Sequence, residues 1–176
     1  MVTKRFDQLL EIHGRLDALF AEHQRALLRL DTELAQARLE DYERALLAHM
    51  QDEEELLLPI YGARAKIPVG GSVEIFLNEH RKMRQYLILF KQEMPKLRAA
   101  EDLEGAVIWL LDSQTTFKRL HVHHDTRERK MLYPLLDEVT TEPERAVLFA
   151  QLTLPPYSLL PVNSEIFSSA FRAESR

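Results

Sequence analysis

The chain has 176 residues, of which 45% are hydrophobic and 29% are charged, and its formal net charge is −5 at pH 7. These values are typical of a single soluble domain with a substantial core. The chain contains no cysteine, which excludes disulfides, iron–sulfur clusters, zinc–thiolate sites and thiol catalysis. Any metal ligands must therefore be His, Asp or Glu.

The charge pattern gives no sign of a polyanionic partner. No run of Lys and Arg is flanked by aromatic residues, so neither nucleic acid nor an acidic membrane surface is expected to bind. The N-terminus becomes polar soon after its first basic residues, and no apolar stretch approaches the roughly 20 residues of a membrane span. We therefore expect a cytoplasmic protein.

Apolar residues at spacings of three and four extend through most of the chain and predict an all-α fold. The first helix is expected to end near Leu30, with an inward face made of Phe6, Leu9, His13, Leu16, Phe20, His23 and Leu27. Asp31 is a suitable N-cap for a second helix, whose inward face includes Leu39, Tyr42, Leu46, His49, Glu53, Leu56 and Ile60. Pro59 and the segment GARAKIPVGG are expected to end this helix and to leave a connection at about residues 62–71.

A third helix is expected to begin near Ser72, with an inward face made of Phe76, His80, Met83, Leu87, Phe90, Met94 and Leu97. After a turn at about residues 98–102, a fourth helix has the inward face Val107, Leu110, Phe117, His121, His124, Glu128, Met131 and Leu135. Four long amphipathic helices with short connections predict an up-down-up-down four-helix bundle over residues 1–137.

A second region, residues 138–176, is expected to follow the bundle. Its segment EPERAVLFAQL predicts one short helix, with Pro143 in the first turn. The segment LPPYSLLPVNSEIF then forms a tail that is apolar enough to dock. It can pack on its own bundle or on a second copy of the chain in a homodimer.

One phrase occurs twice in the chain. It consists of His49, Glu53, Leu57 and Pro59, and it recurs 75 residues later as His124, Glu128, Leu132 and Pro134. A His and a Glu four residues apart point from the same face of a helix, so each copy offers one imidazole and one carboxylate to a common point. Two copies in a small helical protein suggest a two-metal site.

The height of each histidine in the bundle tests this idea. In an antiparallel pair of helices, residues equidistant from the turn lie opposite each other, because both helices rise by about 1.5 Å per residue. The midpoint of His13 and His49 is residue 31, and that of His49 and His80 falls between residues 64 and 65. The midpoint of His80 and His124 is residue 102, so all three midpoints lie in predicted turns. The predicted metal ligands are therefore His13, His49, Glu53, His80, His124 and Glu128.

Other polar residues on these faces fit the site less well. His23 fails the midpoint test and lies about 15 Å along the axis from His13, so we expect it to be a core or channel residue. His121, one turn before His124, is a candidate fifth ligand or hydrogen-bond partner. Glu54 is a candidate supporting residue within an acidic run that is otherwise typical of a solvated helix face.

These residues and spacings resemble the hemerythrin-like family with the HHE cation-binding signature. The resemblance extends over roughly residues 6–137 and is carried by LLAHMQDEEELLLPIY, FLNEHRKM and LHVHHDTRERKMLYPLLDE. It implies a non-haem centre of two iron ions, with an oxo or hydroxo bridge, inside a four-helix bundle. In the family, one imidazole comes from the first helix, one from the third, and a His/Glu pair from each of the other two, which are the positions found above.

Two departures from the oxygen-carrying hemerythrins bear on function. Those proteins have a second histidine four residues beyond the one on the third helix, where this chain has Arg84. They also have an Asp five residues beyond the histidine of the fourth helix, where this chain has Arg129, so Glu128 must serve instead. The resemblance thus implies a variant with four His and two carboxylates, which argues against reversible oxygen carriage.

The leading hypothesis is a di-iron protein that binds or senses a small oxidant, such as oxygen, nitric oxide or peroxide, or that responds to iron. The alternatives are a di-iron redox enzyme (an oxidase, a peroxidase, a nitric oxide reductase or an iron-centre repair protein) and a bundle in which the metal is only structural. A ferritin-like site is not supported, because no Glu stands three residues before any of the four histidines. A hydrolytic zinc site lacks an evident constellation for a substrate.

Overall fold

A computed structural model describes residues 4–154 of the chain, and this part contains helices and connections but no strand. The predicted all-α class is confirmed. The long helices are α1 (Leu10–Leu28), α2 (Thr32–Asp52), α4 (Val73–Arg98) and α5 (Leu103–Arg127). The shorter elements are η1 (Phe6–Leu9), η2 (Glu53–Leu57), α3 (Leu58–Arg64), η3 (Glu128–Leu132), α6 (Tyr133–Val139) and α7 (Glu142–Gln151).

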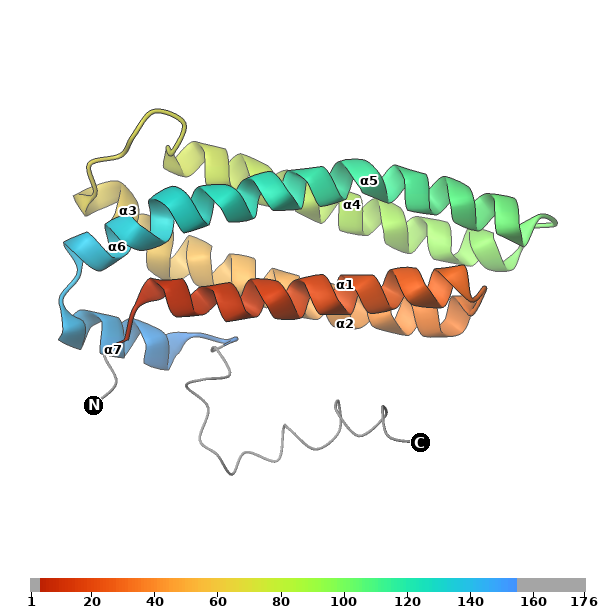
Figure 1. Ribbon diagram of the computed structural model, residues 1–176, viewed down its shortest axis with the longest axis horizontal. Helices are drawn as coiled ribbons and strands as arrows, with labels where there is room; N and C mark the ends of the chain where they lie inside the picture. Colours follow the sequence, from red (N-terminus) through yellow and green to blue (C-terminus); the bar gives the residue numbers. More distant parts are fainter. Residues whose placement is uncertain (1–3, 155–176) are drawn as a thin grey trace, which may run out of the picture.

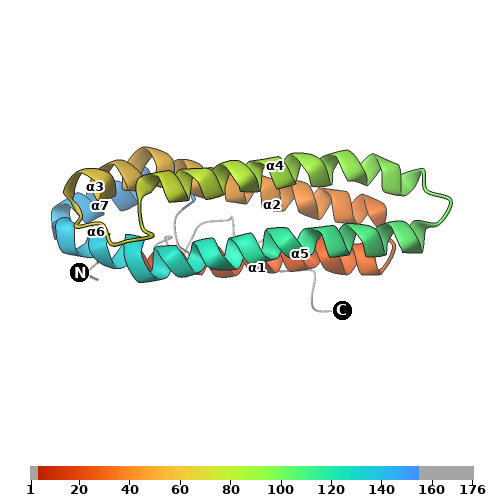
Figure 2. The ribbon, with the colours of Figure 1, turned by 90° about the horizontal axis from the view of Figure 1, so that it is seen from above.

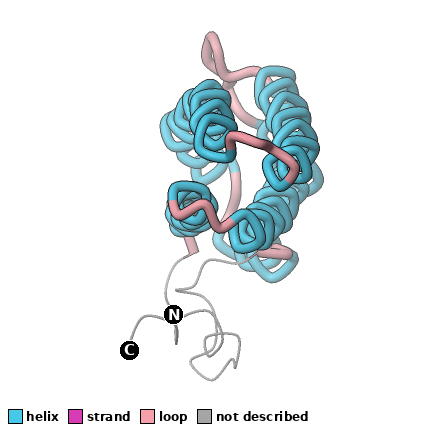
Figure 3. The backbone as a smooth tube through the Cα atoms, turned by 90° about the vertical axis from the view of Figure 1, so that its right-hand side faces the viewer, coloured by secondary structure: helices cyan, strands magenta, loops and turns pink. Residues whose placement is uncertain are grey.

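The four long helices lie side by side as two antiparallel hairpins, α1 with α2 and α4 with α5 (Figures 1 and 2). Both hairpin turns are at one end of the molecule, and α3, α6 and α7 gather at the other (Figure 1). Seen end-on, the long helices surround a common centre (Figure 3). None of the helices within residues 4–154 has both the length and the apolar character that a membrane span requires.

Side-chain caps set the starts of two long helices. The Asp31 carboxylate accepts a hydrogen bond from the Leu34 amide at 3.0 Å, which confirms the predicted N-cap of α2. Asp102 does the same for α5 through the Gly105 amide at 2.9 Å. The turns before these caps are short, so the two hairpins are tight and the helices on either side of each turn lie in register.

The repeated phrase folds in the same unusual way in both copies. Helices α2 and α5 do not end at the phrase but pass through one π-helical turn each, η2 and η3, and continue as α3 and α6. Pro59 was expected to help end the second helix, but the helix continues to Arg64. A proline inside a helix has no N–H and its ring collides with the carbonyl four residues earlier, and a wider turn relieves both problems.

The short C-terminal helix, predicted at EPERAVLFAQL, is α7, and it packs on the bundle. Thr141 and Glu144 form a capping box at its start, and the rings of Phe149 and Phe6 lie 5.4 Å apart. The division of the chain at residue 138 stays a prediction. The predicted tail and its docking or dimer contact begin at Leu154 and otherwise lie outside the described residues.

A buried polar network far from the repeated phrase joins α1, α2 and α5. His23 is fully buried, its Nδ1 donates to the Ala35 carbonyl at 2.7 Å, and its Nε2 accepts from the Gln114 amide at 2.9 Å. The Gln24 amide in turn donates to Gln114 Oε1 at 2.9 Å. His23 is therefore a satisfied core residue, as its height in the bundle predicted.

We expect Gln114→Leu to destabilise the fold by about 1–3 kcal/mol, because it leaves His23 Nε2 and the Gln24 amide without their partner inside the bundle. Urea unfolding followed by circular dichroism measures this change. The matched control is Gln51→Leu, at an exposed position of α2. Equal stability of the Gln114 variant and the unmodified chain would show that the network contributes nothing.

Candidate metal centre

The six residues predicted as ligands lie together in one buried layer of the bundle. His13 comes from α1, His49 from α2, His80 from α4 and His124 from α5. Glu53 and Glu128 are the first residues of the two π-helical turns. None of the six is more than 4% exposed. The turn between each His and Glu of the repeated phrase therefore places both on the inner face, as the spacing predicted.

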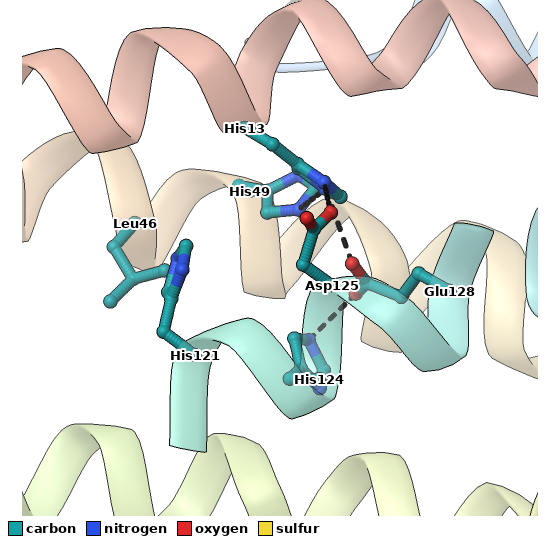
Figure 4. A pocket seen from close by; sticks show the side chains of 7 residues that line it. All are labelled: His13, Leu46, His49, His121, His124, Asp125 and Glu128. Carbon is teal, nitrogen blue, oxygen red and sulfur yellow. Dashed lines mark hydrogen bonds and ion pairs between the residues drawn. The ribbon is translucent and has the colours of Figure 1, made fainter. Parts of the chain in front are cut away.

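The imidazoles form two pairs, each with its Nε2 atoms facing each other. The distance is 3.2 Å between His13 Nε2 and His49 Nε2, and 3.1 Å between His80 Nε2 and His124 Nε2. Glu128 lies between the pairs, with Oε2 at 3.2 Å from His13 Nε2 and Oε1 at 2.6 Å from His124 Nε2 (Figure 4). Each pair therefore has one oxygen of Glu128 beside it.

Glu53 lies between the same two pairs. Its Oε2 is 3.3 Å from His80 Nε2, and its Oε1 is 3.8 Å from His49 Nε2. Donor atoms of Glu53, His80, His124 and Glu128 form one group close enough to hold a cation, and those of His13, His49 and Glu128 form a second. The structure thus brings all the predicted ligands into two adjoining groups.

Three of the four imidazoles are held from behind by a carboxylate. His13 Nδ1 bonds to Asp125, His80 Nδ1 to Glu54 at 2.8 Å, and His124 Nδ1 to Glu79 at 2.9 Å. When Nδ1–H donates a hydrogen bond to a carboxylate, the proton of the neutral ring is on Nδ1, and Nε2 has a lone pair directed toward the centre. This is the usual support of a metal-binding histidine.

The donor atoms are spaced as the ligands of a transition metal are. Two donors at right angles around a metal with bonds of about 2.1 Å lie about 3.0 Å apart, close to the separations of the histidine pairs. Glu53 Oε2 and both oxygens of Glu128 are buried and have no hydrogen-bond donor among the described residues. Such orphaned oxygens are costly unless a cation or a proton satisfies them. The residues present therefore fit a metal cation.

Burial and the charges of the neighbouring groups shift the pKa values of the donor groups in different directions. Burial and the nearby charge of Glu53 raise the pKa of Glu128 well above its usual range. Burial opposes ionisation of Glu53, but His49 and His80 outweigh it and hold the pKa of Glu53 well below its usual range. Burial also disfavours the charged form of His13, yet Glu128 and Asp125 raise its pKa. Because a ligand atom must be deprotonated to bind a cation, metal binding at this centre is expected to depend on pH.

A family model described as the hemerythrin HHE cation binding domain matches residues 4–136. The chain belongs to this family. The match covers the whole bundle up to α6, including every residue of the centre. No curated protein and no solved structure matches the chain. Cation binding is thus shown at the level of the family, and within residues 4–154 of this hemerythrin-family chain the buried His and Glu cluster could hold a metal.

The arginines that distinguish this chain from the oxygen-carrying hemerythrins lie behind the supporting carboxylates. Arg84 binds Glu54 through both terminal nitrogens, at 2.9 and 3.0 Å, and Arg129 lies 3.5 Å from Asp125. Arg127, in the same way, binds Glu79. Each of the three supported histidines therefore bonds to a carboxylate, and that carboxylate in turn contacts an arginine guanidinium. His80 first, and then Arg84, lower the pKa of Glu54 to about 2.

Sequence reasoning missed three residues that contact the ligands: Glu79, Asp125 and Tyr133. The Tyr133 hydroxyl is buried, donates to Glu53 Oε1 at 2.9 Å, and lies 3.0 Å from His13 Nε2. Glu79 and Asp125 each stand next to a ligand in the chain. A step of one residue turns a helix by about 100°, so a neighbour of an inward ligand faces the adjacent helix. That signal was available in the sequence.

The remaining predicted residues have different positions. Glu54 supports His80, as described above, and belongs to neither donor group. His121 also lies outside both groups, but it lines a small pocket that reaches the centre. His123 is exposed. The pocket is lined by His13, Leu46, His49, His121, His124, Asp125 and Glu128 (Figure 4).

We expect Asp125→Asn to weaken metal binding by about 10- to 100-fold, because the neutral amide is a weaker acceptor for His13 Nδ1 than the carboxylate, and its NH₂ group can turn toward the ring instead. Competition with a chromophoric chelator measures the affinity. Asp112→Asn, at an exposed position of the same helix, is the matched control and should leave it unchanged. An unchanged affinity in the Asp125 variant would mean that His13 does not depend on this support.

Proposed function

We propose that this hemerythrin-family protein holds two iron ions in the centre and binds or senses a small oxidant there: oxygen, nitric oxide or peroxide. One observation carries the proposal. Two pairs of buried imidazoles present their Nε2 atoms to each other, and two buried carboxylates each direct one oxygen toward each pair. This arrangement supports two cation positions that share Glu53 and Glu128.

The donor set supports iron as the metal. Imidazole and carboxylate suit iron in both its ferrous and ferric states, and no thiolate is present to favour softer metals. His13 and His49 would hold one ion, and His80 and His124 the other. Iron supplies the centre with one-electron chemistry and an affinity for small oxidants. The four-helix up-down arrangement proposed for the bundle supplies a ligand from each long helix.

The surroundings of the centre support a small ligand. Glu53, His80 and Glu128 are almost completely buried, so no large molecule can reach the donor atoms from their side. The pocket beside His13 and His49 is narrow and is lined mainly by the ligands themselves. Arg84 replaces a ligand of the oxygen carriers and is bound to Glu54. Its position favours sensing or reaction over reversible oxygen carriage.

We expect protein produced with iron to contain about two iron ions per chain, because the proposed centre has two cation positions that share Glu53 and Glu128. After exposure to air, this protein should show ferric absorption. Glu53→Ala should lose most of the iron and the absorption, because Glu53 faces both histidine pairs. Glu55→Ala, two residues away and exposed, is the matched control and should retain both. Full iron content in the Glu53 variant, or no iron in the unmodified chain, would contradict the proposed site.

Removal of the metal tests its contribution to folding. A metal at about 100 times its dissociation constant stabilises the folded state by about 2.7 kcal/mol, which for a chain of this size raises the Tm by roughly 5–10 °C. Chelator should therefore lower the Tm of iron-loaded protein by this amount and leave the Glu53→Ala variant unaffected. Calorimetry measures both. A destabilisation in chelator without any spectral response to an oxidant would instead identify a structural metal.

A further inference from the structure

His121 differs from every other histidine near the centre because its ring has no hydrogen-bond partner among the described residues. Its side chain is only 12% exposed, and the nearest carboxylate, Asp17, lies 3.8 Å from Nδ1, beyond hydrogen-bond distance. The fully buried His23, in contrast, uses both of its ring nitrogens. The described residues therefore leave the ring nitrogens of His121 available to another hydrogen-bond partner.

The position of His121 explains what the ring can face. It is on α5 one turn before His124 and lines the pocket that reaches the centre, beside Leu46 (Figure 4). The ligands His13, His49, His124 and Glu128 line the same pocket, whereas His80 and Glu53 do not. A ligand that enters from this side therefore meets His121 and the donors of the His13 and His49 pair together.

The ring is suited to donating rather than to carrying charge. Burial, and then the neighbouring His124 and His13, lower the pKa of His121 to about 4, so the imidazole is neutral near pH 7. A neutral imidazole has one N–H donor. The other polar residues of the pocket wall are the ligands themselves and Asp125. The carboxylate oxygens of Asp125 are acceptors. His121 is thus the wall residue that can donate to an incoming ligand.

We propose that His121 donates a hydrogen bond to the small ligand bound at the centre and makes the site selective for ligands with a terminal atom that accepts one. Peroxide-like ligands and small anions belong to this class, whereas nitric oxide is a poor acceptor. The inference rests on the proposed function, since it requires a metal in the His13 and His49 position. His121 is then a specificity-determining residue outside the set of metal ligands.

The test compares two ligands on iron-loaded protein. Azide is titrated into the ferric form and nitric oxide into the ferrous form, both followed by visible absorption. His121→Leu should weaken azide binding by about tenfold, a typical effect of one hydrogen bond to a charged acceptor, and leave nitric oxide binding unchanged. His121→Gln, which keeps a donor, should retain azide affinity to within about threefold. His123→Leu, at an exposed position of α5, is the matched control.

Other outcomes overturn the inference in distinguishable ways. Equal azide affinity in His121→Leu and the unmodified chain would show that the ring donates nothing. Equal weakening of azide and nitric oxide would show that it only shapes the pocket. Two bound irons without any azide response would refute the role of His121 and leave the proposed function standing. Failure of the unmodified chain to bind iron would refute the proposed function, and the inference with it.

Discussion

The burial of two carboxylates between four imidazoles is the constraint on which the rest of the structure depends. Glu53 and Glu128 are 1% exposed, and two adjacent negative charges in such a place are not stable alone. Either protons or a cation must therefore neutralise these charges. Helix caps, the π-helical turns and hydrogen bonds from the supporting carboxylates fix the positions of the donor atoms around the place where a cation would bind. The cost of this arrangement is met by the apolar core above and below the layer. The donor atoms of the layer therefore fit a metal cation.

The supporting carboxylates follow one order around the bundle. Glu54 on η2, after α2, reaches α4, Glu79 on α4 reaches α5, and Asp125 on α5 reaches α1. Helices α2 and α5 run in the same direction, and there the supporting carboxylate comes directly after a ligand: Glu54 after Glu53, and Asp125 after His124 (Figure 1). Helix α4 runs in the opposite direction, and there Glu79 comes directly before His80. On α1, which runs as α4 does, the residue before His13 is Ile12, and the ring of supports is open there. Of the four histidines of the centre, His49 is accordingly the one without a carboxylate at Nδ1 among the described residues.

Much of the centre could be predicted from the sequence because helix geometry is regular. The rise per residue relates His13, His49, His80 and His124 through the turns, and a spacing of four places Glu53 beside its His. The π-helical turns could not be predicted in this way, since proline usually indicates a helix end and the continuation depends on packing at the far end of the bundle. The partner of a side chain such as Glu79 depends on the rotation of the neighbouring helix, which the pattern of one helix does not contain.

The two copies of the repeated phrase share their ligands but differ in what surrounds them. Glu53 is followed by Glu54, whereas Glu128 is followed by Arg129. Five positions after the ligand Glu, the first copy has Leu58 and the second has Tyr133. Tyr133 donates to Glu53 beside His13, and the pocket opens beside His13 and His49. The hydroxyl thus lies at the His13 and His49 pair, and both members of that pair line the pocket, whereas only His124 of the other pair does. A repeat that is symmetric in its ligands therefore produces a centre with two unlike halves, which differ in their contact with Tyr133 and in how many of their histidines line the pocket.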